Sequence, residues 1–253
     1  DVSEASGIRA GQPGRGLGVI AGDFNGDGHA DLYVANDMSA NYMLLGDGKG
    51  HFREEAYFNG TALSDDGMPL GSMGLAASDY DGDGFTDLFV TNYQGQPNNL
   101  YHGSASGQYQ AVMQLVGAPS HSLPEVSWGV AFADFTQDGW DDVFVANGHL
   151  NPETNRLDPT TTYAQAKRVF RNRGAGSFED VSARCGRAVV EPRVSRGAAS
   201  LTPRLCATQP PLGPGSPDAI FEVTSAEQAQ PTSNRSSKSA PQVPSADMVP
   251  GAN

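Results

Sequence analysis

Short apolar runs alternate with turns rich in glycine and aspartate along the first 183 residues of the chain. The runs are enriched in β-branched and aromatic residues, as is typical of strands bounded by turns. In the run 32–35, Leu-Tyr-Val-Ala, both faces are apolar, as in a strand buried on both sides. No long stretch has helical periodicity. The pattern therefore predicts an all-β chain of short strands and tight turns.

One segment of this pattern occurs three times. "DFNGDGHADLYVAN" begins at Asp23, "DYDGDGFTDLFVTN" at Asp79 and "DFTQDGWDDVFVAN" at Asp134, so the copies start 56 and 55 residues apart. A run of small and apolar residues precedes each copy, and two further apolar runs with a glycine-rich turn between them follow it. Each copy therefore predicts four strands. We expect the fourth strand to end in an aromatic residue: Phe52, Tyr109 and Phe178 in the three copies.

Four-stranded units that repeat about every 50 residues are typical of a β-propeller, whose blades are antiparallel sheets. We predict a propeller unit over residues 1–199 with about three complete blades, at 9–64, 65–118 and 119–183. The alternative of three unrelated acidic turns would require the same Asp, Asp-Gly, Asp and Asn positions to arise three times. We therefore interpret the segment as a repeat.

The repeated loop places oxygen ligands at alternate positions, counted from its first aspartate. Positions 1, 3, 5 and 9 offer side chains and position 7 a backbone carbonyl. The predicted ligands are Asp23, Asn25, Asp27, His29 and Asp31 in the first loop, Asp79, Asp81, Asp83, Phe85 and Asp87 in the second, and Asp134, Thr136, Asp138, Trp140 and Asp142 in the third. A flexible shell of hard oxygen ligands suits Ca²⁺ better than Mg²⁺ and argues against Zn²⁺.

Three features refine this prediction of calcium binding. The loop is not an EF-hand, because Val34 stands at the twelfth position, where an EF-hand requires a glutamate. The second loop offers four carboxylates and should bind most tightly, whereas the third, with three carboxylates and a hydroxyl, should bind most weakly. Asp141 is expected to point away from the third loop. We expect the ions to stiffen the blades rather than to take part in catalysis.

The charge of the chain is negative and unevenly distributed. The 253 residues carry 16 Lys and Arg against 29 Asp and Glu, and residues 1–183 alone have a net charge of −15. Such a surface repels nucleic acid and anionic lipid and favours divalent cations. No apolar run approaches the 18 residues of a membrane span. The two cysteines, Cys185 and Cys206, could form at most one disulfide.

With these loops laid out, the chain resembles the FG-GAP or VCBS repeat superfamily, the calcium-loop propellers that include integrin α-subunit heads. The segments "VANGHLNPE" and "RVSRGAA" in series narrow the resemblance to the cartilage-acidic-protein-like group that carries an ASPIC/UnbV domain. The resemblance covers about residues 1–199. It implies a secreted, periplasmic or cell-surface propeller used for adhesion or binding, and it brings no catalytic residues with it.

Both ends of the chain depart from the family's pattern. The opening "DVS" matches the last strand of a blade, so we expect earlier blades to precede it. After "RVSRGAA" another strand and loop are expected, but residues 200–253 are rich in Pro, Ser, Ala and Gln and should be disordered. Two interpretations of this tail stay open, a natural low-complexity segment and a change of reading frame. We expect no ASPIC/UnbV domain within this tail.

Two functions of different classes are compatible with these residues. The first is a non-catalytic, calcium-stabilised module that binds a protein or glycan partner. The second is a propeller-fold polysaccharide lyase or hydrolase. We favour binding, because nearly all carboxylates are accounted for as calcium ligands. His149 is the most site-like histidine, although a hydrogen-bonded turn histidine is the more common case, and the long segment 147–174 is the preferred surface for partner contact.

Overall fold

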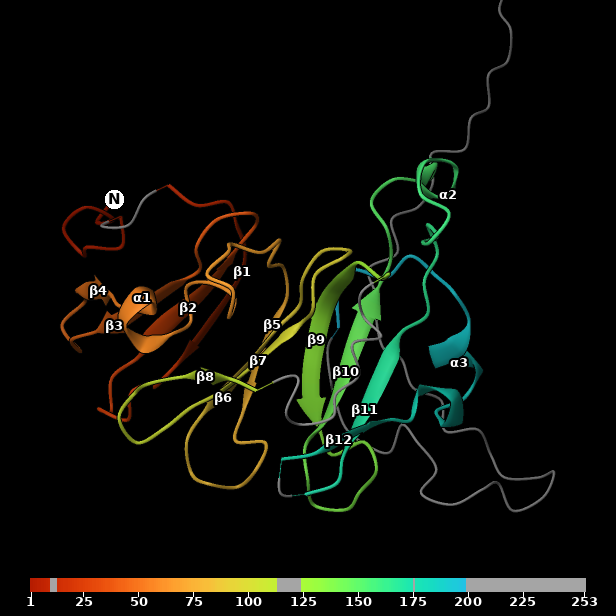
Figure 1. The fold of residues 1–253 in the computed structure, drawn as a ribbon. Coiled ribbons are helices and arrows are strands. Elements are labelled where there is room, and N and C mark those ends of the chain that lie inside the picture. The colour runs from red at the N-terminus through yellow and green to blue at the C-terminus, as the bar shows by residue number, and fades with distance from the viewer. Residues whose placement is uncertain (10–12, 113–123, 175, 199–253) are drawn as a thin grey trace, which may run out of the picture.

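The computed structural model describes residues 1–9, 13–112, 124–174 and 176–198, and these residues form three four-stranded antiparallel sheets (Figure 1). In each sheet the strands pair in chain order. The strands are β1 (Gly16–Gly22), β2 (Asp31–Asn36), β3 (Tyr42–Gly46), β4 (Phe52–Glu54), β5 (Leu75–Ser78), β6 (Asp87–Val90), β7 (Asn99–His102), β8 (Gln110–Ala111), β9 (Ser127–Ala133), β10 (Asp142–Asn147), β11 (Arg168–Asn172) and β12 (Phe178–Asp180). The predicted fold class of antiparallel four-stranded blades is confirmed.

The boundary of the fourth strand differs from the prediction. The aromatic residue stands at its beginning: Phe52 opens β4, Phe178 opens β12, and Tyr109 comes directly before β8. The reason lies in the hairpin register, which pairs Phe52 with Gly46, the last residue of the third strand. There the ring lies over a glycine, whose missing side chain leaves room for it. The aromatic residue thus closes the turn instead of ending the blade.

The three sheets follow one another with their first strands side by side, β1 next to β5 and β5 next to β9 (Figure 1). A glycine near the start of each first strand allows the backbone of the following segment to come close. A Cβ atom placed on Gly18 would lie 2.5 Å from the Met73 carbonyl oxygen, and one on Gly74 would lie 1.8 Å from that of Trp128. Only glycine fits at these positions without movement of the neighbouring strand.

Residues 193–198 continue this arrangement on the far side of the third blade. The backbone N–H of Gly129 donates to the Arg196 carbonyl at 2.8 Å, and that of Ser195 donates to the Asn147 carbonyl at 3.1 Å. A Cβ atom on Gly129 would lie 2.3 Å from the Ala198 nitrogen. This segment therefore occupies, beside β9, the place that β9 itself takes beside β5.

The apolar core lies between successive blades rather than within one. Tyr33 and Met43 of the first blade pack with Leu88 and Tyr101 of the second. A second cluster joins the second and third blades, and its central members are Phe89, Leu100, Val130, Val143 and Phe170. The second blade buries side chains against both of its neighbours. Its central strands, β6 and β7, therefore carry apolar residues on both faces.

One blade face lacks such a neighbour among the described residues. On β1 the side chains of Leu17 and Val19 are 55% and 65% exposed. The corresponding residues of later blades, Met73 and Val130, are only 5% and 7% exposed, because the preceding blade covers them. The first blade therefore presents an apolar face of the kind that is buried elsewhere in the chain.

Helices are short and lie outside the sheets. They are α1 (Ala56–Asn59), α2 (Thr154–Leu157), α3 (Arg187–Val190) and a 3₁₀ helix at Ser182–Arg184. Of these, α2 lies within the segment 147–174, which the sequence singled out for partner contact, and protrudes beyond the sheets in Figure 1. Across the ranges that the structure describes, every helix is too short to cross a bilayer. The tail predicted to be disordered, 200–253, and Cys206 within it lie outside those ranges.

Candidate metal centre

The first aspartate of each repeated loop binds the backbone of its own turn. Asp23 accepts hydrogen bonds from the N–H groups of Gly26, Asp27 and Gly28 at 2.8, 3.1 and 2.9 Å. Asp79 accepts the equivalent three bonds in the second loop, and Asp134 accepts two of them in the third. The loop is thereby curled around its first carboxylate, with its alternate side chains directed to one side.

The ninth aspartate joins each loop to the third strand of its blade. Asp87 accepts hydrogen bonds from the N–H groups of Tyr80 and Gly103 at 3.0 and 2.8 Å, and its side chain is fully buried. Asp31 is buried and bonded in the same way, and Asp142 is buried and accepts from Asn172 and from Thr136, the third rather than the second loop residue. Burial raises the pKa of Asp87 to about 7 and that of Asp142 to about 6, although these N–H groups oppose the rise. A nearby cation would stabilise each carboxylate in its charged form.

Carboxylates converge most closely in the second loop. Oxygen atoms of Asp79, Asp81 and Asp87 lie within 4.8 Å of one another. Calcium–oxygen distances are about 2.3–2.6 Å, so two ligands on opposite sides of one ion lie about 5 Å apart. Gly84 makes the turn with a φ of +92°, a conformation that suits glycine. These three residues fit a hard cation, and they are three of the four side chains predicted for this site.

Comparison with known proteins identifies the repeat. The family described as FG-GAP-like repeat matches residues 23–90 and 79–145, and each match begins at the first aspartate of a loop. The chain contains FG-GAP-like repeats. The resemblance inferred from the loops is thereby confirmed, and the loops at Asp23, Asp79 and Asp134 are called FG-GAP loops below.

Two curated relatives cover the same part of the chain. Cartilage acidic protein 1 of Mus musculus is 30% identical over 159 residues, which are 62% of this chain and 23% of that protein. Its Homo sapiens counterpart is 28% identical over 159 residues, which are again 62% of this chain and 23% of that protein. The chain thus spans about a quarter of the length of these relatives. Their similarity agrees with the narrower resemblance drawn from the sequence.

Among solved structures, a similarity is found to an Agrocybe aegerita lectin, whose structure is described as the basis of specific recognition of non-reducing terminal N-acetylglucosamine. The sequence identity is 19%, the TM-score is 0.39, and the alignment covers 63% of this chain and 36% of that one. A similarity of this size supports no conclusion about fold or ligand.

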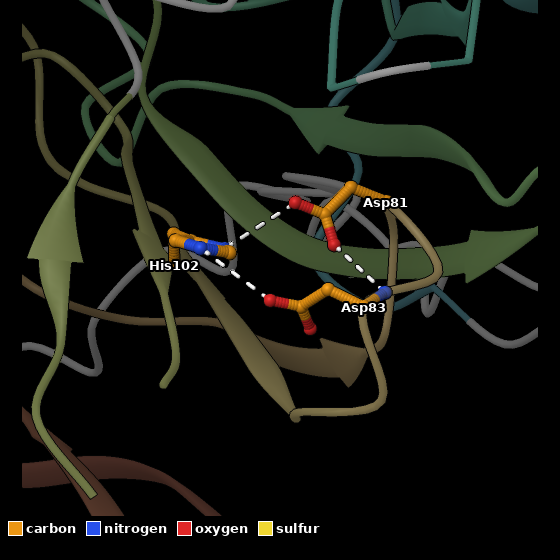
Figure 2. A group of neighbouring side chains, drawn as sticks. All are labelled: Asp81, Asp83 and His102. Atoms are coloured by element: carbon orange, nitrogen blue, oxygen red, sulfur yellow. Dashed lines mark hydrogen bonds and ion pairs between the residues drawn. The ribbon is translucent and has the colours of Figure 1, made fainter. Parts of the chain in front are cut away.

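A histidine that the sequence analysis did not assign to the metal site lies over the second FG-GAP loop (Figure 2). His102, at the end of β7, has its Nδ1 atom 3.2 Å from Asp87 and 3.4 Å from Asp81, and its Nε2 atom 3.6 Å from Asp83. Both ring nitrogens therefore face carboxylates. The second site therefore offers nitrogen as well as oxygen atoms. Because imidazole nitrogen is a common ligand of Zn²⁺, this ion is not excluded at the second site as it would be by oxygen ligands alone.

The first FG-GAP loop opens onto a pocket of about 450 Å³. Asn25 and Asp27, the third and fifth loop residues, line it together with Leu45 of β3. The Asn25 amide nitrogen donates to Asp27 Oδ2 at 3.0 Å, and the Asn25 Oδ1 atom accepts the Asp27 N–H at 3.0 Å, so the two side chains hold each other in the turn. The loop therefore presents its ligands to open space beside an apolar side chain.

The third FG-GAP loop keeps the same backbone but has different side chains. Gln137 adopts a φ of +56° where the other loops have glycine, so the path of the turn is retained. Thr136 replaces the third-position ligand, and its buried hydroxyl lies beside Asp138 and Asp142. Arg171 of β11 binds Asp138 through Nε and one terminal nitrogen, at 3.1 and 2.7 Å. Asp141 accepts a hydrogen bond from Ser78 of the preceding blade at 2.5 Å and thus points away from the loop.

The seventh loop residues contact the fifth-position carboxylates through their backbone N–H groups. His29, Phe85 and Trp140 donate to Asp27, Asp83 and Asp138 at 2.8, 2.9 and 3.2 Å. This hydrogen bond holds each fifth carboxylate in the turn. The use of the seventh carbonyl oxygens as ligands stays a prediction.

His149, the histidine singled out in the sequence, is a buried structural residue. Its Nδ1 accepts the Asn151 N–H at 3.0 Å, so its Nε2 carries the proton and can donate to Gln94 at 3.1 Å. Its carbonyl oxygen accepts a hydrogen bond from Arg196 at 3.0 Å. Burial lowers the pKa of His149 and favours the neutral ring. The residue joins the second blade to the segment that contains α2.

Proposed function

We propose that this chain is a calcium-stabilised, non-catalytic propeller module that binds a protein or glycan partner outside the cytoplasm. The observation that carries the proposal is the set of FG-GAP loops, each ending in a fully buried aspartate that joins the loop to the third strand. An ion bound there would tie the loop to the blade through that aspartate. Calcium binding would therefore act on the stability of the fold.

The ligands of the proposed calcium sites are the predicted loop residues. In the second loop they are the side chains of Asp79, Asp81, Asp83 and Asp87 with the carbonyl of Phe85, and in the first Asp23, Asn25, Asp27 and Asp31 with the carbonyl of His29. The third loop, from Asp134 to Asp142, is expected to have the lowest affinity. When bound, calcium would supply positive charge to carboxylates that burial holds close together.

A location outside the cytoplasm follows from the affinity expected of such sites. Exposed loops with three or four carboxylates resemble the class of sites with dissociation constants of about 10⁻⁴–10⁻³ M. Millimolar extracellular calcium fills such sites, whereas the calcium of resting cytosol does not. The similarity to cartilage acidic protein 1 supports the same location.

A non-catalytic role is supported by the state of the candidate catalytic groups. His149 is fully engaged in hydrogen bonds, and His102 faces the carboxylates of the second loop. The loop carboxylates themselves hold backbone N–H groups in place. Neither of these two histidines lines the pocket beside the first loop. His29 and His51 line it, and the Nδ1 atom of His51 is paired with Asp47 at 3.0 Å.

The segment between β10 and β11 is the surface that we expect to contact a partner. It contains α2 and projects from the sheets (Figure 1). The side chains of Leu150 and Leu157 are 55% and 77% exposed on it. Exposed leucines on a protruding, anchored segment are suited to contact with another molecule.

Calorimetry and thermal melts of the whole chain test calcium binding. We expect Ca²⁺ to raise the melting temperature, with a gain of about 2.7 kcal/mol per site at a free concentration 100-fold above the dissociation constant. Asp83→Ala should remove the tightest site, whereas Asp138→Ala should have the smallest effect on the difference in melting temperature between calcium and chelator. An unchanged melting temperature in chelator would show that the loops are acidic turns without a metal function.

Binding to arrays of glycans and extracellular proteins tests the second half of the proposal. The chain should retain a partner in calcium and lose it in chelator, because the blades carry the contact surface. Leu157→Ser, which leaves the FG-GAP loops intact, should weaken capture without changing the calcium-dependent melting temperature. Turnover of a polysaccharide on the same array would favour the lyase or hydrolase instead.

A further inference from the structure

One position on the third strand of each blade faces the FG-GAP loop. The N–H groups of Gly46, Gly103 and Asn172 all donate to the ninth aspartate of their loops, so these three residues are structurally equivalent. The residue before each of them is therefore equivalent as well. These residues are Leu45, His102 and Arg171.

All three side chains at this position reach the loop carboxylates or the space beside them. Leu45 lines the pocket that also contains Asn25 and Asp27. His102 contacts the carboxylates of Asp81 and Asp83 (Figure 2) and that of Asp87. Arg171 binds the fifth-position carboxylate of the third loop.

The blades differ at this position in charge. Leu45 is apolar and itself supplies no charge to the first loop, and His102 offers nitrogen atoms to the second. Arg171 carries a permanent positive charge, because a guanidinium stays protonated in proteins. The third loop is thus the one in which the third strand supplies a fixed cation.

We propose that Arg171 is the resident cation of the third FG-GAP loop and takes the place of a metal ion there. The Nε and Nη2 atoms of Arg171 both donate to the Oδ2 atom of Asp138. The Trp140 N–H donates to the other carboxylate oxygen, Oδ1. The ion pair is about three-quarters shielded from water, with side-chain exposures of 25% and 22%. A metal ion at this oxygen would have to displace a guanidinium held by two hydrogen bonds.

The ligand set of the third loop agrees with this assignment. With Thr136 at the third position, the loop has three carboxylates, and Arg171 neutralises one of them. The second loop has four carboxylates and only a histidine beside them. The buried hydroxyl of Thr136, which lies beside Asp138 and Asp142, stands at the third ligand position of this loop. A neutral hydroxyl is a weak ligand, however, and does not compensate for the guanidinium charge.

The inference rests on the proposed function only where it contrasts the third loop with calcium binding by the first and second loops. Hydrogen exchange of the loop amides in the whole chain provides a readout that does not depend on calcium. In chelator, Arg171→Leu should speed exchange at Asp138, Gly139 and Trp140 severalfold, whereas Arg171→Lys, which keeps the charge, should speed it less. Equal exchange in the wild type and Arg171→Leu would overturn the inference.

Calcium titration then separates the three loops. We expect the wild type to bind two ions and Thr136→Asp, which restores the missing carboxylate, still to bind two. Thr136→Asp combined with Arg171→Leu should bind three. Three ions in the wild type or in Thr136→Asp alone would overturn the inference, and so would two in the double variant. If no variant binds calcium, the proposed function fails, and the exchange experiment in chelator decides on Arg171.

Discussion

The contact between blades at Gly74 makes a substitution to alanine a sensitive test of the propeller arrangement. A Cβ atom at this position would lie 1.8 Å from the Trp128 carbonyl oxygen and 2.8 Å from Thr91 Oγ1. Contacts below 3.0 Å are essentially not found for real Cβ atoms, so β9 would have to move by about 1.2 Å relative to β5. The obstacle is backbone, which cannot rotate away as a side chain can.

The expected cost has two parts. Overpacking of this kind costs about 1–3 kcal/mol. The movement also breaks the hydrogen bond of 2.5 Å from Thr91 Oγ1 to the Trp128 carbonyl, whose net contribution is about 0.5–1.5 kcal/mol. Gly74→Ala should therefore lower the free energy of unfolding by about 2–4 kcal/mol. For a chain of this size, each kcal/mol corresponds to about 2–4 °C in melting temperature.

Thermal unfolding followed by circular dichroism, in calcium and in chelator, measures this effect. Gly16→Ala is the matched control, because its Cβ atom would meet only the side chains of Val34 and Asn36, at 3.4 and 3.6 Å. Both substitutions reduce the entropy of the unfolded chain alike. Gly18→Ala, at 2.5 Å from a carbonyl oxygen, should fall between them. If Gly74→Ala and Gly16→Ala melt at the same temperature, the blades do not pack as described.

Three further predictions concern single side chains. Because burial lowers the pKa of His149 in the folded chain, its contribution to stability should be complete above about pH 6.5 and lost as the pH falls toward the folded pKa. His149→Gln should remove that part of the pH dependence in urea titrations at pH 8, 6 and 5. His102→Leu should weaken binding of Zn²⁺ to the second loop while calcium binding persists, because it removes the nitrogen ligand and leaves the carboxylates, as calorimetry with each ion would show. Leu17→Ser with Val19→Ser should reduce self-association in sedimentation experiments and leave the melting temperature almost unchanged, because both side chains are exposed.

The sequence predicts the strands and the loops well because both depend on local chemistry. The spacing of Asp and Gly in each loop determines which side chains face one another within nine residues. The alternation of apolar runs and turns likewise determines the four strands of each blade. Because the pattern occurs three times, it is interpreted as a repeat rather than as three unrelated acidic turns. The start of the fourth strand at Phe52 could not be predicted in this way. It depends on which residues pair across the hairpin, and the glycine-rich turn alone does not determine that pairing.

The residues around the loops are harder to predict because they come from a different strand. His102 lies 15 residues after Asp87, and Arg171 lies 33 residues after Asp138. No motif of fixed spacing connects them. A signal was present, since aligning the third apolar runs of the three repeats places Leu45, His102 and Arg171 in one column. The dual role of the ninth aspartate, which is a predicted ligand and also an anchor for the third strand, becomes visible only when its burial is known.

The row of blades repeats one contact, in which the first strand of each blade lies beside the first strand of the next. Residues 195–198 lie beside β9 as β9 lies beside β5, so they take the place of the first strand of a further blade. The face of β1 that carries Leu17 and Val19 is of the same kind as the faces that the later blades bury against one another. A further blade placed beside β1 would therefore bury both side chains.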